Sequence, residues 1–165
     1  MNIQNADYWI SRLKMIPHPE GGFYMEVFRS RIEIYRKSAG DMKQACTSIY
    51  YLLQGTDYSG FHRIASDEIW YYHKGVPLFI YELTVSGLLI THELSDQSTG
   101  CLSVAIEAGS WFAASLPSGE GFSLVSCAVA PAFDFKEFEM ANKDELKQLY
   151  PEYGSLIERF CRLTV

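Results

Sequence analysis

The chain has 165 residues, 48% of them hydrophobic and 21% charged, and a formal net charge of −6 at pH 7. This length and apolar content predict one folded domain over residues 1–165 and exclude a largely disordered chain. The acidic balance argues against nucleic-acid binding, and no apolar run reaches the roughly 20 residues that a membrane helix needs. The first residues lack the pattern of a signal peptide, so we expect a cytoplasmic protein with neither a nucleic acid nor a membrane as partner.

Helices are predicted at both ends of the chain, near residues 5–16 and near residues 142–163. In the first region, apolar residues recur at helical spacing and two prolines end the pattern. In the second region, Asn142 is suited to cap a helix, and Pro151 is suited to open another.

The motif "HPEGGFY", His18 to Tyr24, contains the second of these prolines and leads into the first expected strand. Its prolines and glycines predict a rigid turn that leads from the helix into a sheet. An alternative interpretation is functional, with Glu20 or Glu26 at the mouth of a pocket.

The middle of the chain consists of short runs rich in Val, Ile, Tyr and Phe, separated by Gly, Pro, Ser and Asp clusters. Many short strands at this spacing predict a β-sandwich or barrel rather than alternating strands and helices. Some runs are apolar on both faces, which fits a barrel with an outer layer or a dimer interface. We expect strands near residues 22–30, 47–54, 60–64, 68–74, 78–84, 88–94, 102–107, 111–116 and 122–130, with "RSRIEIYRK" as a solvated strand or loop.

The stretch "SGFHRIASDEIWYYHKG" carries the most distinctive chemistry. Strand alternation places Glu68, Trp70 and Tyr72 on one face and leaves His73 on the other, at a surface or interface. Antiparallel pairing of this strand with the preceding short strand predicts that His62 lies close to Glu68.

This stretch resembles the first signature of the cupin superfamily, with His62 at the first ligand position, Glu68 at the Glu position and Gly75 at the Gly position. The segment "EAGSWF" resembles the second signature. Almost the entire chain, from "HPEGGFYMEVFRS" to "YPEYGSLIERF", resembles one uncharacterised group of small cupins. The resemblance implies a mainly β fold, a double-stranded β-helix (the cupin jelly-roll barrel) with an N-terminal helix and C-terminal helices, and a homodimer.

The resemblance also shows where a cupin metal site is incomplete. A typical cupin metal is held by three His and one Glu, but Ile64 and Phe112 stand at the second and third His positions. Only His62 and Glu68 remain as metal ligands, and a zinc or iron site usually needs three protein ligands. We therefore expect no cofactor. A divalent metal is the alternative, with a side chain such as His18 or Glu26 completing the set.

We expect an aromatic-lined pocket that binds a small molecule. The leading hypothesis is metal-free acid–base chemistry of the epimerase or isomerase kind on a sugar or carbonyl metabolite. In it His62 and Glu68 form a hydrogen-bonded pair, and Tyr72 returns a proton. The alternatives are a metal-dependent oxygenase or hydrolase and a non-catalytic binding module. The remaining predicted ligand-binding residues are Trp70, Trp111, Glu26, Arg29 and Arg63; the two arginines would bind an anionic group or pair with acidic side chains.

Overall fold

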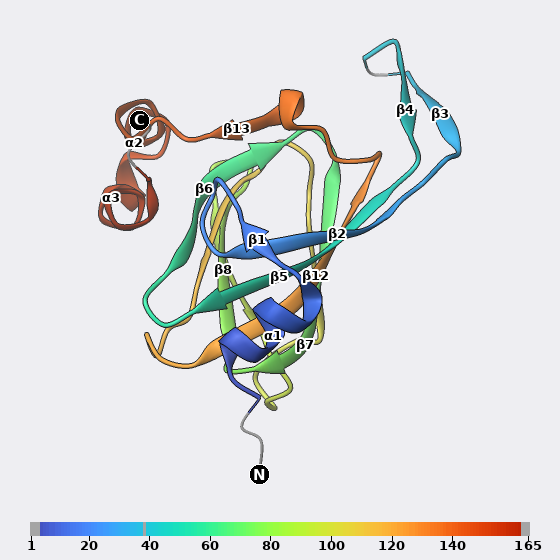
Figure 1. Cartoon of the computed structure of the whole chain (residues 1–165). Coiled ribbons are helices and arrows are strands. Elements are labelled where there is room, and N and C mark those ends of the chain that lie inside the picture. Colours follow the sequence, from blue (N-terminus) through green and yellow to red (C-terminus); the bar gives the residue numbers. More distant parts are fainter. Residues whose placement is uncertain (1–3, 38, 163–165) are drawn as a thin grey trace.

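The computed structural model describes residues 4–37 and 39–162, and its main body is two antiparallel β-sheets (Figure 1). Buried side chains of both sheets meet in one core between them. The six-stranded sheet has the order β1 (Ile16–Pro17), β2 (Phe23–Arg29), β5 (Thr47–Gln54), β12 (Phe122–Ala130), β7 (Asp67–Gly75) and β10 (Ser103–Ile106). The five-stranded sheet has the order β13 (Phe138–Met140), β6 (Tyr58–Ile64), β11 (Trp111–Ser115), β8 (Leu78–Leu83) and β9 (Leu89–Leu94).

From β5 to β8 and again from β9 to β13, each strand is followed by one in the other sheet, which is the connectivity of a jelly roll. The prediction of a mainly β, jelly-roll fold with helical ends is confirmed. The prediction that the strands of His62 and Glu68 pair with each other is wrong, because β6 pairs with β11 and β13 whereas β7 pairs with β10 and β12. The bend between β6 and β7 carries the chain from one sheet to the other.

Helices cover the outer face of each sheet. The N-terminal helix α1 (Ala6–Leu13) begins where the Asn5 side chain accepts a hydrogen bond from the Tyr8 N–H, and it packs on the six-stranded sheet around Leu52 and Leu124. Near the C-terminus, Asn142 caps α2 (Lys143–Leu149) as predicted. Pro151 opens the short 3-10 turn η2 (Pro151–Tyr153), and α3 (Gly154–Phe160) follows. Among the described residues, no helix is long and apolar enough to span a membrane.

One hairpin projects from this body. It consists of β3 (Glu33–Arg36) and β4 (Asp41–Gln44), which pair only with each other (Figure 1). The sequence favoured a solvated strand or loop for residues 29–37, and the structure places β3 there. A two-stranded hairpin is marginally stable alone, so its contacts with the body matter. Those contacts run to the 3-10 turn η1 (Phe135–Glu137), next to the candidate site.

Candidate functional site

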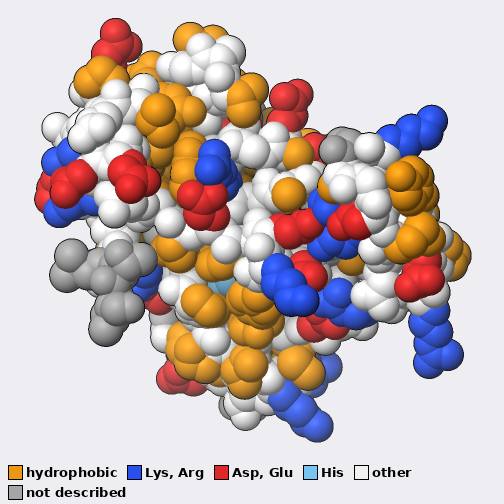
Figure 2. Space-filling model, turned by 90° about the horizontal axis from the view of Figure 1, so that it is seen from above, with side chains coloured by type: hydrophobic (Ala, Val, Ile, Leu, Met, Phe, Trp, Pro, Cys, Tyr) orange, Lys and Arg blue, Asp and Glu red, His pale blue; other side chains and the backbone are white. Residues whose placement is uncertain are grey.

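A cavity of about 130 Å³ lies between the two sheets, beside η1. A volume of this order accommodates a molecule of about six non-hydrogen atoms, since a benzene-sized cavity is similar. Seen from above, apolar side chains gather in the lower middle of the molecule, and a histidine shows between them (Figure 2). The cavity lining is His18, Glu20, Tyr24, Glu26, Arg29, Thr47, Ile49, Tyr51, His62, Ile64, Glu68, Cys127, Val129, Phe133, Phe135 and Phe138.

His62 reaches the cavity from β6 and is only 2% exposed. Its Nδ1 donates to the Gly60 carbonyl at 2.8 Å, and its Nε2 lies 3.2 Å from Oε2 of Glu20. The carboxyl partner of His62 is therefore Glu20. Among the described residues no hydrogen bond joins His62 to Glu68, which corrects the expected pair.

Glu20 is held in place by the backbone of the loop that carries it. Its carbonyl accepts hydrogen bonds from the Gly60 N–H at 2.8 Å and from Nε of Arg162 at 2.6 Å. The next carbonyl, that of Gly21, accepts from the buried Tyr51 hydroxyl at 2.7 Å. Because Gly60 also accepts from His62, one peptide segment fixes both members of the His62–Glu20 pair.

Gly21 shows why this loop requires glycine. Its φ is +116°, a value that side chains strongly disfavour. A Cβ there would also lie 2.1 Å from the Tyr58 carbonyl oxygen. The motif "HPEGGFY" was interpreted either as a rigid turn or as a functional segment that carries Glu20. Both interpretations describe this loop, because the rigid turn directs the Glu20 side chain into the cavity.

Glu68 enters the cavity from β7, in the other sheet, and is 7% exposed. Burial, reinforced by the nearby charge of Glu20, raises the pKa of the Glu68 carboxyl to about 8. At neutral pH this carboxyl therefore keeps its proton and is a hydrogen-bond donor. Trp70 follows on the same face of β7, as predicted, but it is a core residue and does not line the cavity.

His18 adds a second imidazole to this cluster. Its Nδ1 accepts from the Glu20 N–H at 3.3 Å and lies 3.4 Å from Oε2 of Glu20. Its ring contacts Tyr24 edge-on at 4.6 Å and stacks at 6.0 Å with Phe135. Burial lowers the pKa of His18, so its imidazole is neutral at pH 7.

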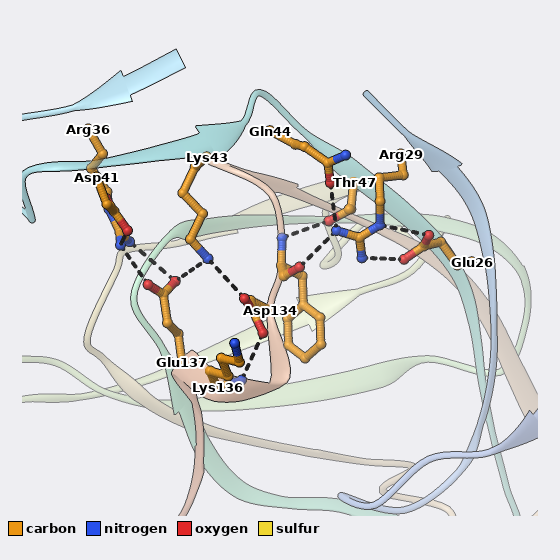
Figure 3. Close-up of polar contacts among 11 residues, drawn as sticks. Glu26, Arg29, Arg36, Asp41, Lys43, Gln44, Thr47, Asp134, Lys136 and Glu137 are labelled. Carbon is orange, nitrogen blue, oxygen red and sulfur yellow. Dashed lines mark hydrogen bonds and ion pairs between the residues drawn. The ribbon is translucent and has the colours of Figure 1, made fainter. Parts of the chain in front are cut away.

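Arg29 and Glu26 line the cavity as a bidentate ion pair (Figure 3). Nε of Arg29 donates to Oε1 of Glu26 at 3.0 Å, and Nη2 donates to Oε2 at 2.7 Å. Nη1 donates to Oε1 of Gln44 at 3.1 Å and to the Phe133 carbonyl at 3.2 Å. The pair joins β2 to β4 and to the segment before η1.

Besides Trp70, three more residues expected in the pocket lie elsewhere. The Tyr72 hydroxyl donates to the Gly75 carbonyl at 2.7 Å, and Tyr72 does not line the cavity. Trp111 points to the opposite face of its sheet, into the cluster beneath the C-terminal helices. Arg63 lies over the Trp111 ring at 4.5 Å and donates to Glu139 at 2.7 Å. The structure brings together only Glu26, Arg29, His62 and Glu68 of the predicted site residues.

The residues at the cupin ligand positions do not fit a metal centre of the usual cupin kind. Ile64 lines the cavity where a second histidine would stand, and Phe112 packs its ring 4.2 Å from the His62 ring where a third would stand. Neither side chain can ligate a metal. Across residues 4–37 and 39–162, no three His, Cys, Asp or Glu side chains are arranged to hold a metal ion.

Three features of the cavity were not assigned from the sequence. Glu20 was considered only for the pocket mouth, although a Glu between a proline and two glycines is a signal for a fixed side chain. Cys127 lines the cavity, and its proximity to Glu68 follows from strand pairing that no local pattern reveals. The aromatic segment "AFDFKEF" was assigned no chemistry, yet Phe133, Phe135 and Phe138 line the cavity.

Comparisons with known proteins agree with this architecture. A family model described as "Cupin superfamily (DUF985)" matches residues 7–141. A hypothetical protein from Leishmania major is similar at 32% identity and a TM-score of 0.90, over 95% of this chain and 98% of that chain. A protein from Shewanella oneidensis is similar at 34% identity and a TM-score of 0.87, over 97% and 99%.

A more distant likeness concerns the fold alone. Oxalate decarboxylase from Bacillus subtilis is similar at 11% identity and a TM-score of 0.54, over 92% of this chain and 38% of that chain. A comparison with curated proteins found no match.

Proposed function

Since the chain belongs to the cupin superfamily, in the family DUF985, we propose that its barrel cavity binds a small carbonyl metabolite and moves a proton on it by acid–base chemistry. The observation that carries this proposal is that one cavity contains a carboxyl group that keeps its proton at neutral pH, Glu68, and a second carboxyl group, Glu20, whose Oε2 lies 3.2 Å from Nε2 of His62. Two carboxyl groups in environments that separate their protonation states are the usual basis for an acid and a base.

In the proposed chemistry Glu68 acts as the acid, and Glu20 acts as a carboxylate that His62 orients. The Glu20 carboxylate removes a proton from the carbon next to the substrate carbonyl, and the C–H electron pair forms the C=C bond of an enol. Glu68 donates its proton to the carbonyl oxygen. Glu20 then returns a proton to the neighbouring carbon while the hydroxyl group on the original carbon gives its proton to the Glu68 carboxylate and becomes the new carbonyl, which yields an isomer and restores both groups.

The test is exchange of substrate C–H protons with D₂O, followed by proton NMR on dihydroxyacetone and glyceraldehyde. We expect exchange with the wild-type protein and a loss of about 100-fold or more in Glu20→Gln and Glu68→Gln, which is typical of general acid–base groups. Glu82→Gln is the matched control, because Glu82 forms a buried pair with His92 at 2.8 Å outside the cavity. It should exchange like the wild type.

Equal exchange in Glu20→Gln and Glu82→Gln would contradict the proposal. Binding of the two probes to the wild-type protein without any exchange would instead favour the second candidate, a binding module. The aromatic side chains around the cavity, which include Phe133, Phe135 and Phe138, favour that candidate.

A further inference from the structure

The cavity lining offers a ligand few basic groups. Among the described residues it contains three carboxyl groups, those of Glu20, Glu26 and the protonated Glu68, one guanidinium, that of Arg29, and no lysine. Glu26 already neutralises Arg29 through the bidentate pair. A ligand that enters would therefore meet the carboxyl group of Glu20 and the protonated carboxyl of Glu68, and no guanidinium or ammonium group free of a carboxylate partner among the described lining residues.

Arg29 has little capacity left for a ligand. A guanidinium has five N–H donors. Four are used within the protein: two on Glu26, one on Gln44 and one on the Phe133 carbonyl (Figure 3). Bidentate recognition of a carboxylate or phosphate needs two free parallel donors, which Arg29 in this arrangement does not have. Arg29 thus supports the cavity wall.

We propose that the cavity selects ligands whose inserted end carries no negative charge, and that Glu26 sets this selection by occupying Arg29. The ligand class is then small uncharged hydroxycarbonyl compounds, as opposed to their carboxylated or phosphorylated counterparts. The inference rests on the proposed function only in that the cavity takes a ligand. A neutral Glu68 is consistent with it, because a protonated carboxyl donates to an uncharged carbonyl oxygen.

The experiment compares binding of two small probes, hydroxyacetone and pyruvate, by NMR titration at pH 7. The probes are similar in size and differ in charge. We expect pyruvate to bind the wild-type protein at least about tenfold more weakly than hydroxyacetone, and to gain about tenfold or more in affinity in Glu26→Gln, which frees the Arg29 charge. The double variant Glu26→Gln with Arg29→Gln should lose that gain.

The matched control is Glu139→Gln, which removes the carboxylate partner of Arg63 outside the cavity. It should bind both probes like the wild type. Pyruvate binding to the wild-type protein as tight as hydroxyacetone binding would overturn the inference, and so would Glu26→Gln without any gain for pyruvate. Because the readout is binding, failure of C–H exchange would refute the proposed catalysis and leave the charge selection standing.

Discussion

Two buried carboxyl groups share the cavity, and their immediate neighbours differ. Glu20 has an imidazole nitrogen of His18 and one of His62 within 3.4 Å of its Oε2. Glu68 forms no hydrogen bond or ion pair to a basic side chain among the described residues. An unpaired carboxylate is costly to bury, so Glu68 stays protonated at neutral pH. The absence of a basic partner among the described residues therefore suits Glu68 to act as the acid.

The protonation of Glu68 makes the stability of the protein depend on pH. The pKa of this carboxyl is about 8 in the folded protein, against 4.5 for an unperturbed Glu. Between these values the folded state binds a proton that the unfolded state has released, so the free energy of unfolding falls as pH rises. Glu68→Gln does not titrate there. Relative to the wild type, we expect it to gain several kcal/mol between pH 5 and pH 9, at about 1.4 kcal/mol per pKa unit.

Urea unfolding of both proteins at pH 5, 7 and 9 measures this difference. If the stability difference between Glu68→Gln and the wild type were the same at all three pH values, Glu68 would not be a protonated group at neutral pH. An increase that is complete by pH 7 would place the folded-state pKa of Glu68 below 7.

At the scale of elements, the loop of residues 18–22 is positioned by long-range contacts. The Tyr51 hydroxyl of β5 donates to Gly21, and the side chain of Arg162, after α3, donates to Glu20. Such contacts join parts of the chain that are far apart in sequence. Sequence reasoning identified the turn from its prolines and glycines, but not the partners that aim Glu20.

We expect Tyr51→Phe to leave the Gly21 carbonyl without its buried donor. The loss should cost about 1–3 kcal/mol of stability and slow C–H exchange, because Glu20 is then held less firmly. Tyr150→Phe is the control: its hydroxyl also donates to a carbonyl, that of Thr84, but outside the cavity. Thermal unfolding and exchange rates measured on both variants check this; equal exchange rates would argue against a positioning role for Tyr51.

A second element, the projecting hairpin, is tied to the cavity rim by charge. Glu137 of η1 accepts from Arg36 at 2.6 Å and from Lys43 at 2.7 Å, one residue from each hairpin strand (Figure 3). The hydrogen bond from Arg36 lowers the pKa of Glu137. This contribution is therefore present above the pKa of the unfolded chain and is lost as pH falls through the lowered, folded-state pKa.

We expect Glu137→Gln to increase deuterium uptake of backbone amides in residues 33–44 at pH 7, since a hairpin of two strands needs its anchor. The control Glu158→Gln removes a carboxylate that pairs with Lys143 and Lys147 on the far helices. It should leave hairpin uptake unchanged. Equal uptake in the two variants, measured by mass spectrometry, would show that charge does not anchor the hairpin.

At the scale of the whole molecule, local patterns were enough for the fold but not for the site. Alternation and turn residues located the main strands, because the two faces of a strand can be recognised from its own sequence. The resemblance to cupins supplied the order in which the strands are joined. The His62–Glu68 pair failed because adjacent strands in sequence lie in different sheets. Glu20 became a site residue only through backbone contacts made across the fold. A sequence pattern shows which side chains of one strand share a face. A cavity is lined by side chains from several strands and loops, and their arrangement depends on how the strands pair.

The outer face of the six-stranded sheet is covered over only part of its area. Helix α1 packs over the part near Leu52 and Leu124. The register aligns Phe28, Ser48, Ala128 and Ile69 in one row across β2, β5, β12 and β7, on the outward side. In this row Phe28 is 53% exposed and Ile69 is 36% exposed. An apolar strip on a sheet face is typical of a surface that meets another protein.

We expect this strip to join two copies of the chain, in line with the homodimer predicted from the sequence. Light scattering after size-exclusion chromatography should give twice the chain mass for the wild type and one chain mass for Ile69→Lys, because a charge buried within an apolar interface is left without a partner. The control Leu149→Lys changes an equally apolar, 66% exposed side chain on α2 and should remain a dimer. A wild-type protein with the mass of one chain would refute the expectation. A dimer that persists in Ile69→Lys would place the contact on another face, and the strip would then need a different explanation for its exposure.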